Sequence, residues 1–123
     1  MDRSASPVNP QYCISKHALV GLARCIGPPF LENENITVNA ICPALILTAL
    51  CPPEIRDMFP KEQLTPMSTA LSAFDRFLDD DRLTGKVAEL SIEKVIMREQ
   101  VEFATENQRW QMVDALKIWR QGY

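Results

Sequence analysis

The stretch Ile36–Cys42, which reads ITVNAIC, limits the possible folds of this chain more than any other segment. It is rich in β-branched and apolar residues, and apolar groups fall on both of its faces. Such a pattern is typical of a strand in a parallel sheet whose two faces are covered. Pro43 should end the strand, because proline cannot donate a hydrogen bond to the ladder. Since a helix is expected before this strand, the pattern predicts part of a β-α-β unit and an α/β fold.

The helix that precedes this strand is predicted from its two ends. Asn9 is a good N-cap, and Pro10 follows at the first helical position, where its missing N–H costs nothing. Gly27 fits the position after the last turn, and the two prolines behind it should stop the helix. We therefore expect a helix from Pro10 to Ile26, with an apolar stripe at every fourth residue: Ile14, Ala18, Leu22 and Ile26.

The remainder of the chain contains one further strand and mostly helical segments. One or two helical turns are expected within Pro53–Phe59 and a longer helix over Pro66–Asp79. A short strand is expected over Val87–Ile92, and Thr105 is the N-cap of a C-terminal helix. The longer helix should place six apolar side chains in the core: Met67, Ala70, Leu71, Phe74, Phe77 and Leu78. In the last helix four residues should face the core or a partner: Trp110, Val113, Leu116 and Trp119. The sequence thus predicts a mostly helical α/β domain with two short parallel strands.

Composition excludes several classes of function. The chain has 123 residues, a hydrophobic fraction of 46% and a net charge of −3 without a basic cluster, which argues against nucleic-acid binding. No apolar run approaches the ~20 residues that span a bilayer, so we expect no membrane partner and a cytoplasmic protein. The four cysteines and the single histidine lack the spacing of zinc ligands, so no metal site is expected and the cysteines should be reduced thiols.

Tyr12 and Lys16 form the candidate catalytic pair. They lie four residues apart and therefore on one face of the predicted helix. A lysine ammonium beside a phenol favours the phenolate and would lower the pKa of the tyrosine, so that it can act as a general acid or base. The alternative is an ordinary surface pair, because tyrosine and lysine at this spacing occur in many helices.

An ordered set of motifs around this pair resembles the C-terminal half of a short-chain dehydrogenase/reductase, a Rossmann-type family that uses NAD or NADP. The set comprises Tyr12-x-x-Ser15-Lys16, the strand with Val38-Asn39, the turn at Pro43-Ala44, and Thr48. Three later segments are similar to fungal members described as hydroxyprostaglandin-dehydrogenase-like: Pro66–Ala70, Leu83–Val87 and Glu106–Trp110. Taken together, residues 1–123 are expected to form one partial Rossmann-like domain.

The resemblance implies a role for each matching residue. Tyr12 would be the general acid/base, and Lys16 would lower its pKa and hold the nicotinamide ribose. Ile46 and Thr48 would contact the nicotinamide end of NAD or NADP, and residues 53–78 would cover a small alcohol or ketone substrate. The implied activity is oxidoreduction of a secondary alcohol or ketone, and one expectation is a role in secondary metabolism. The resemblance also implies a homo-oligomer or association with a full-length family member.

The chain also departs from the family pattern. Its four glycines do not form the Gly-x-Gly-x-x-Gly turn that holds the pyrophosphate, and no serine stands where the catalytic serine of the family would be. Ala44 replaces the usual glycine after Pro43. Two alternatives to an active enzyme therefore remain open. One is a truncated, inactive relative that acts as an association partner, and the other is a small α/β binding module in which Tyr12 and Lys16 are surface residues.

Overall fold

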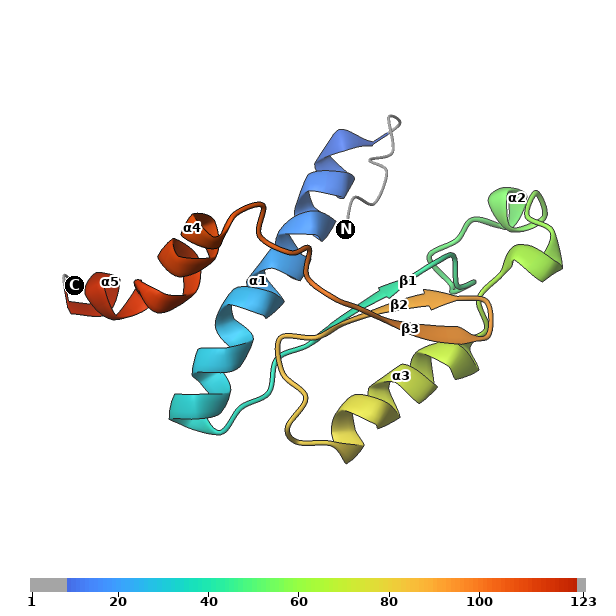
Figure 1. Cartoon of the computed structure of the whole chain (residues 1–123). Coiled ribbons are helices and arrows are strands. Elements are labelled where there is room, and N and C mark those ends of the chain that lie inside the picture. The colour runs from blue at the N-terminus through green and yellow to red at the C-terminus, as the bar shows by residue number, and fades with distance from the viewer. Residues whose placement is uncertain (1–8, 122–123) are drawn as a thin grey trace.

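The structure is a computed structural model that describes residues 9–121. Its element order is helix, strand, two short helical turns, helix, two strands and a helical C-terminal arm (Figure 1). The bounds are α1 Pro10–Glu34, β1 Ala40–Pro43, α2 Pro53–Arg56, a 3-10 turn Lys61–Gln63, α3 Met67–Asp79, β2 Val87–Ser91, β3 Lys94–Arg98, α4 Glu106–Arg109, a π-helical turn Trp110–Asp114, and α5 Leu116–Gln121. The chain is therefore a mixed α/β protein, as expected.

The three strands form one mixed sheet in the order β1-β2-β3. β1 and β2 are parallel, with Ala40 opposite Val87, as the sequence predicted. β3 runs antiparallel to β2 and closes a hairpin with it, so the prediction of only two strands is wrong. The missed strand shows alternate burial, with Val95 and Met97 turned toward the core. Its sequence has three consecutive apolar residues between Lys94 and Arg98, so only the observed burial alternates and the sequence carries no alternation that marks a strand covered on one face.

β1 begins at Ala40, four residues later than predicted. The residues before it are held by other contacts. The N–H of Val38 donates to the hydroxyl of Thr84 at 3.1 Å, and the carbonyl of Val38 accepts from the N–H of Gly85 at 2.7 Å. These bonds guide the chain into the sheet without extending the ladder.

Asn39 joins β1 to the loop before β2 through its side chain. Its amide donates to the carbonyl of Leu83 at 2.7 Å and accepts from the N–H of Lys86 at 3.0 Å. We expect Asn39→Ala to lower the free energy of unfolding by about 1–3 kcal/mol, because two backbone groups lose their partner. Urea denaturation measures this change, and Asn33→Ala on the exposed side of α1 is the control, with an expected effect within about 0.5 kcal/mol. Equal effects of the two substitutions would contradict this role of Asn39.

Helix α1 continues to Glu34, and the prediction that it ends at Ile26 is wrong. Pro28 and Pro29 both lie inside the helix. The helix ends instead at Asn35, which adopts a left-handed conformation with φ of 56° and donates its N–H to the carbonyl of Leu31 at 3.2 Å. Asparagine tolerates this conformation better than most residues, so it replaces glycine as the terminating residue.

Gly27 has a packing role that differs from the predicted helix end. A Cβ atom at this position would lie 2.5 Å from the backbone nitrogen of Gly85. The absence of a side chain therefore lets α1 approach the loop before β2. Pro28 lies against the same loop, because a Cβ on Gly85 would lie 3.4 Å from its ring. The close approach fixes the C-terminal half of α1 near the start of β1 and β2.

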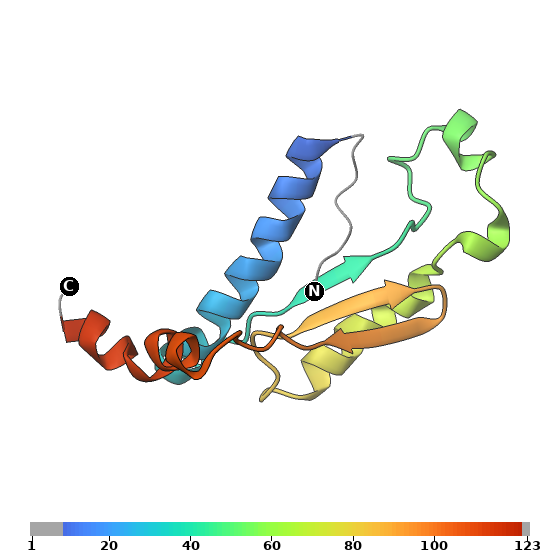
Figure 2. The same ribbon diagram turned by 45° about the horizontal axis from the view of Figure 1, so that its top comes forward.

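The helices α1 and α3 lie on opposite faces of the sheet (Figures 1 and 2). On the α3 face, Ala70 and Ala73 pack against Ala88 and Leu90 of β2, and this cluster forms the core. Five partly buried apolar side chains surround it: Ile41, Ile46, Phe77, Val95 and Met97. On the other face Ala23 of α1 is buried. The arrangement is helix, sheet and helix, with β1 at one edge.

Several apolar side chains that were predicted to be buried are exposed. In α3 they are Met67, Leu71, Phe74 and Leu78. Ile14 and Leu22, which belong to the predicted apolar stripe of α1, are also exposed. Trp110, Val113 and Leu116 of the C-terminal arm are also more than 40% exposed, so the core contains none of these three; the side chain of Trp119 lies outside the described residues. Among residues 9–121, the surfaces of α1, α3 and the arm are therefore unusually apolar for an isolated domain.

Candidate active site

The first turn of α1 holds Tyr12 in place through its cap. The side-chain oxygen of Asn9 accepts from the N–H of Tyr12 at 3.0 Å, and the carbonyl of Asn9 accepts from Cys13 at 3.1 Å. Pro10 occupies the first helical turn, so the predicted start of the helix is confirmed. The cap fixes the backbone of Tyr12 at the beginning of the helix.

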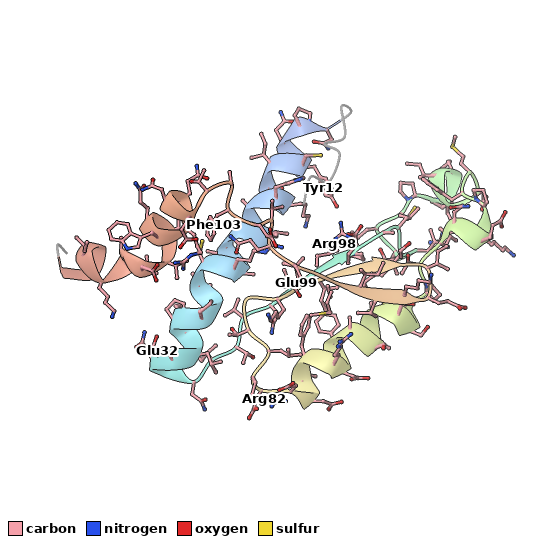
Figure 3. All side chains as sticks on the ribbon, viewed as in Figure 1. Tyr12, Glu32, Arg82, Arg98, Glu99 and Phe103 are labelled. Carbon is pink, nitrogen blue, oxygen red and sulfur yellow. The ribbon has the colours of Figure 1, made fainter. Side chains whose placement is uncertain are left out.

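Tyr12 and Lys16 lie together, as their spacing predicted. The Nζ atom of Lys16 lies 5.5 Å from the centroid of the Tyr12 ring, which is a cation–π contact. The Tyr12 side chain is 58% exposed and projects from the N-terminal part of α1 (Figure 3). In this arrangement the ammonium lies over the ring, and the phenol remains open to a ligand.

Lys16 also lines a hollow of about 250 Å³ between α1 and β1. The helix contributes Leu19, Val20, Leu22 and Ala23 to this hollow, and the strand side contributes residues 38–42. Since Gly27 meets the start of the sheet and α1 runs back along β1, Lys16 lies toward the end of the strand. Ligands of open α/β sheets bind beyond the carboxyl ends of the strands, so this is the appropriate end for a ligand.

A second hollow of about 420 Å³ lies on the other face of β1. It is lined by Thr37, Asn39 and Ile41 of the strand side and by Phe74, Phe77 and Leu78 of α3. Both hollows adjoin the edge of β1 that does not face β2. The N–H of Ala40 donates to the carbonyl of Lys86, just before β2, and the N–H of Ala44 donates to the carbonyl of Leu90 in β2, so Pro43 faces the opposite side, where its missing donor is tolerated. Among the described residues, α1 and α3 therefore each line one of the two hollows beside β1.

Ile46 and Thr48 lie on the loop that follows β1. Ile46 is partly buried and packs against the core cluster. Thr48 is exposed, and its hydroxyl accepts from the N–H of Leu50 at 3.3 Å in a local turn. Within residues 9–121, no described hydrogen bond or ring contact joins either residue to Tyr12 or Lys16. The structure therefore brings Tyr12 and Lys16 together but shows no contact between this pair and the other predicted site residues, Ile46 and Thr48.

The strongly paired charges lie away from this region. Arg82 donates to Asp80 at 2.9 Å in the loop before β2, and this hydrogen bond lowers the pKa of the Asp80 carboxyl. In the arm, Arg109 donates to Glu106 and Asp114, and its hydrogen bond to Glu106 lowers the pKa of that carboxyl. In the described part of the chain, no group of histidine, cysteine and carboxylate side chains is arranged to hold a metal ion.

The cysteines and helices were also assigned from the sequence. Cys13, Cys25, Cys42 and Cys51 are not joined by disulfide bonds. His17 is exposed, and its Nδ1 lies within hydrogen-bonding distance, 2.8 Å, of the backbone carbonyl oxygen of Cys13 in the same helix. None of the helices among residues 9–121 has the length and hydropathy needed to cross a bilayer.

Comparison with known proteins places these features beside dehydrogenases. The chain is 33% identical over 88 residues to the short-chain dehydrogenase/reductase prx6 of Penicillium rubens. This aligned region covers 71% of this chain and 30% of that protein. It is 26% identical over 103 residues to human 15-hydroxyprostaglandin dehydrogenase (NAD+), covering 71% of this chain and 39% of that protein. It is 38% identical over 53 residues to D-beta-hydroxybutyrate dehydrogenase of Rhizobium meliloti, over 43% of this chain and 20% of that protein. No protein-family model matches the chain.

The fold and the paired tyrosine and lysine define an α/β chain with a candidate site at the carboxyl end of a parallel strand. The chain resembles part of the short-chain dehydrogenase/reductase family, and its relatives are oxidoreductases by name. The matched region spans about a third of the length of these relatives. The predicted resemblance is therefore confirmed for part of such a protein.

The sequence did not indicate the buried hydrogen bonds of Thr65, near the loop that follows β1. Thr65 is 2% exposed; its N–H donates to the carbonyl of Leu45, and its hydroxyl accepts from the N–H of Ile92, which follows β2. Its position before Pro66 signalled only a helix start. Its partners lie on segments far from it in the chain, so no local pattern points to them.

Proposed function

We propose that the chain forms the C-terminal part of an NAD- or NADP-dependent oxidoreductase that acts on a secondary alcohol or ketone. The observation that carries the proposal is the pairing of Tyr12 and Lys16 on α1, with Lys16 lining a hollow that residues 38–42 also line. In this function the Tyr12 phenol exchanges the alcohol proton. The Lys16 ammonium stabilises the phenolate by its charge and donates to the ribose hydroxyls of the nicotinamide nucleotide.

The nicotinamide nucleotide would supply the hydride acceptor or donor of the reaction. Ile46 and Thr48 would flank its nicotinamide end, because they follow β1 at the same edge of the sheet. The exposed hydroxyl of Thr48 provides a hydrogen-bonding group there, and Ile46 provides apolar surface. The side chains of this chain thus fit the nicotinamide half of the cofactor, and the pyrophosphate half needs a glycine-rich turn that residues 1–123 lack.

The free edge of β1 supports a larger doubly wound sheet. Apolar side chains of α1 line one hollow beside β1, and apolar side chains of α3 line the other. A further parallel strand with two apolar faces would fill this space and pair with the open edge. We therefore propose that the 1–123 chain is one part of a Rossmann-type domain. Its four cysteines form no disulfide bond, which fits a reducing compartment such as the cytoplasm.

Hydride transfer by a chimera tests the catalytic proposal. The chimera joins the N-terminal part of the Penicillium relative to this chain, and it is assayed with NAD and NADP against a panel of secondary alcohols and ketones. We expect turnover with one of the two cofactors. A folded chimera that binds the cofactor and turns over no member of the panel would overturn the catalytic assignment.

A second candidate is an inactive relative that associates with a complete dehydrogenase. The exposed apolar side chains of α1, α3 and the C-terminal arm favour it, because patches of this kind mark interaction surfaces. Co-purification of the chain with an intact family member, together with an inactive chimera, would favour this second function over the first. An active chimera would favour the first.

A further inference from the structure

Two buried threonines hold the turn between β2 and β3. The Oγ1 atom of Thr65 accepts from the N–H of Ile92 at 3.1 Å, and the Oγ1 atom of Thr69 donates to the carbonyl of Ile92 at 2.7 Å. Thr65 is 2% exposed and Thr69 is 5% exposed. Both polar backbone groups of the turn residue are therefore bound by side chains from the start of α3.

Ile92 adopts a conformation that its side chain disfavours. Its φ is 53°, in the left-handed region, where a β-branched residue is rarely found. The ordinary residue for such a turn is glycine or asparagine. The two threonine hydroxyls compensate for this strain by fixing the N–H and the carbonyl of Ile92. The turn thus depends on α3 as well as on the hairpin.

The same threonine ties together the two ends of residues 46–64, which we call the loop segment. The N–H of Thr65 donates to the carbonyl of Leu45 at 2.9 Å, and the N–H of Ala44 donates to the carbonyl of Leu90 at 3.0 Å. The loop segment leaves the sheet and returns to it at one point, and α2 projects with it (Figure 1). Its exposed apolar side chains include Leu50, at 94% exposed, and Met58, at 78%.

We infer that Thr65 and Thr69 are positioning residues that clamp the base of the loop segment to the β2–β3 turn through Ile92. Because its two ends are tied at one point, the loop segment can move as a unit over the carboxyl end of β1 while its base stays fixed. Ile46 and Thr48 are the first residues of the loop segment, next to its fixed base and to the end of β1. That the loop segment covers a bound substrate rests on the proposed function. The clamp formed by Thr65 and Thr69 rests on their hydrogen bonds alone.

Hydrogen exchange of the 123-residue chain tests the clamp. Thr65→Val keeps the shape of the side chain and removes the acceptor for Ile92, so we expect amides of residues 44–66 and 91–93 to exchange about tenfold faster. Thr65→Ser keeps the hydroxyl and should restore the original rate. Amides in the middle of α1 should change by less than about twofold. A uniform acceleration over the whole chain, or no acceleration at residues 44–66, would overturn the clamp.

A second variant separates the clamp from simple loss of stability. Ile92→Gly adopts the left-handed conformation without strain, so the effect of Thr65→Val should fall to about twofold in that background. An undiminished tenfold effect would overturn the role of Ile92. In the chimera, Thr65→Val should raise KM about tenfold and leave kcat within about twofold. If the chimera is inactive but Thr65→Val accelerates exchange at residues 44–66 as expected, the proposed function is contradicted and the clamp is supported.

Discussion

Replacing Gly27 by alanine is expected to lower the free energy of unfolding by about 3 kcal/mol. The added Cβ would lie 2.5 Å from the backbone nitrogen and 2.8 Å from the Cα atom of Gly85, and 2.9 Å from the hydroxyl of Thr84. Two of these atoms belong to the backbone, so a side-chain rotation cannot remove the overlap. The helix must move away from the loop that leads into β2, which weakens the contact between α1 and the sheet.

Gly21 provides a matched control in the same helix. A Cβ at this position meets no atom within 4 Å. Gly21→Ala should therefore raise the free energy of unfolding by about 0.5–1 kcal/mol, because alanine restricts the unfolded chain. Urea denaturation followed by circular dichroism measures both changes. Equal effects of the two substitutions would mean that α1 does not pack against Gly85.

Removing the phenolic hydroxyl of Tyr12 is expected to lower kcat of the chimera by about a thousandfold, within the range of general acid–base catalysis. The phenol is the only group on this chain that our proposal assigns to proton transfer. Tyr12→Phe keeps the ring and therefore keeps the contact with the Lys16 ammonium. The side chain is 58% exposed, so the substitution should leave the melting temperature nearly unchanged.

His17→Ala is the control for this experiment. His17 is exposed on the same helix, and its Nδ1 lies 2.8 Å from the carbonyl oxygen of Cys13. We expect its kcat to stay within about twofold of the parent chimera. A Tyr12→Phe chimera that keeps the parent kcat would contradict the assignment of Tyr12 as the acid/base. A loss of the same size in His17→Ala would attribute the effect to the helix rather than to the phenol.

Elements with local signals were predicted correctly from the sequence. The start of α1 follows from Asn9 and Pro10, and the cap at Thr105 accepts from the N–H of Gln108 at 3.2 Å as its pattern predicted. β2 and α3 were placed within one residue of their observed bounds. In each case the determining residues lie within a few positions of the element, so the chain itself carries the signal.

Features that depend on distant residues were not predicted. Gly27 reads as a helix end because its contact with Gly85 is invisible in the local sequence. Thr65 reads as a helix start because its partners Leu45 and Ile92 come from other segments. The apolar stripe of α3 was expected to be buried, yet Phe74 is 54% exposed. Periodicity identifies an apolar face, and the neighbouring segments decide whether that face is covered.

The candidate site was predicted in part. The spacing of Tyr12 and Lys16 is a local helical relation, and the contact between them follows from it. The positions of Ile46 and Thr48 relative to this pair depend on how the loop after β1 leaves the sheet, which no local pattern determines. Their cofactor contacts therefore remain a prediction.

Binding of the reduced cofactors is the measurement that tests the account most directly, because it needs no knowledge of the substrate. We would record thermal melts of the chimera with NADH and with NADPH, alongside Lys16→Met and the control His17→Ala. We expect one of the two cofactors to raise the melting temperature of the chimera. Lys16→Met should weaken the apparent affinity for this cofactor at least tenfold, and His17→Ala should leave that affinity unchanged. The proposed cofactor binding would be contradicted if neither cofactor changed the melting temperature of a cooperatively melting chimera. The role of Lys16 would be contradicted if the shift were equal in the parent chimera and in Lys16→Met.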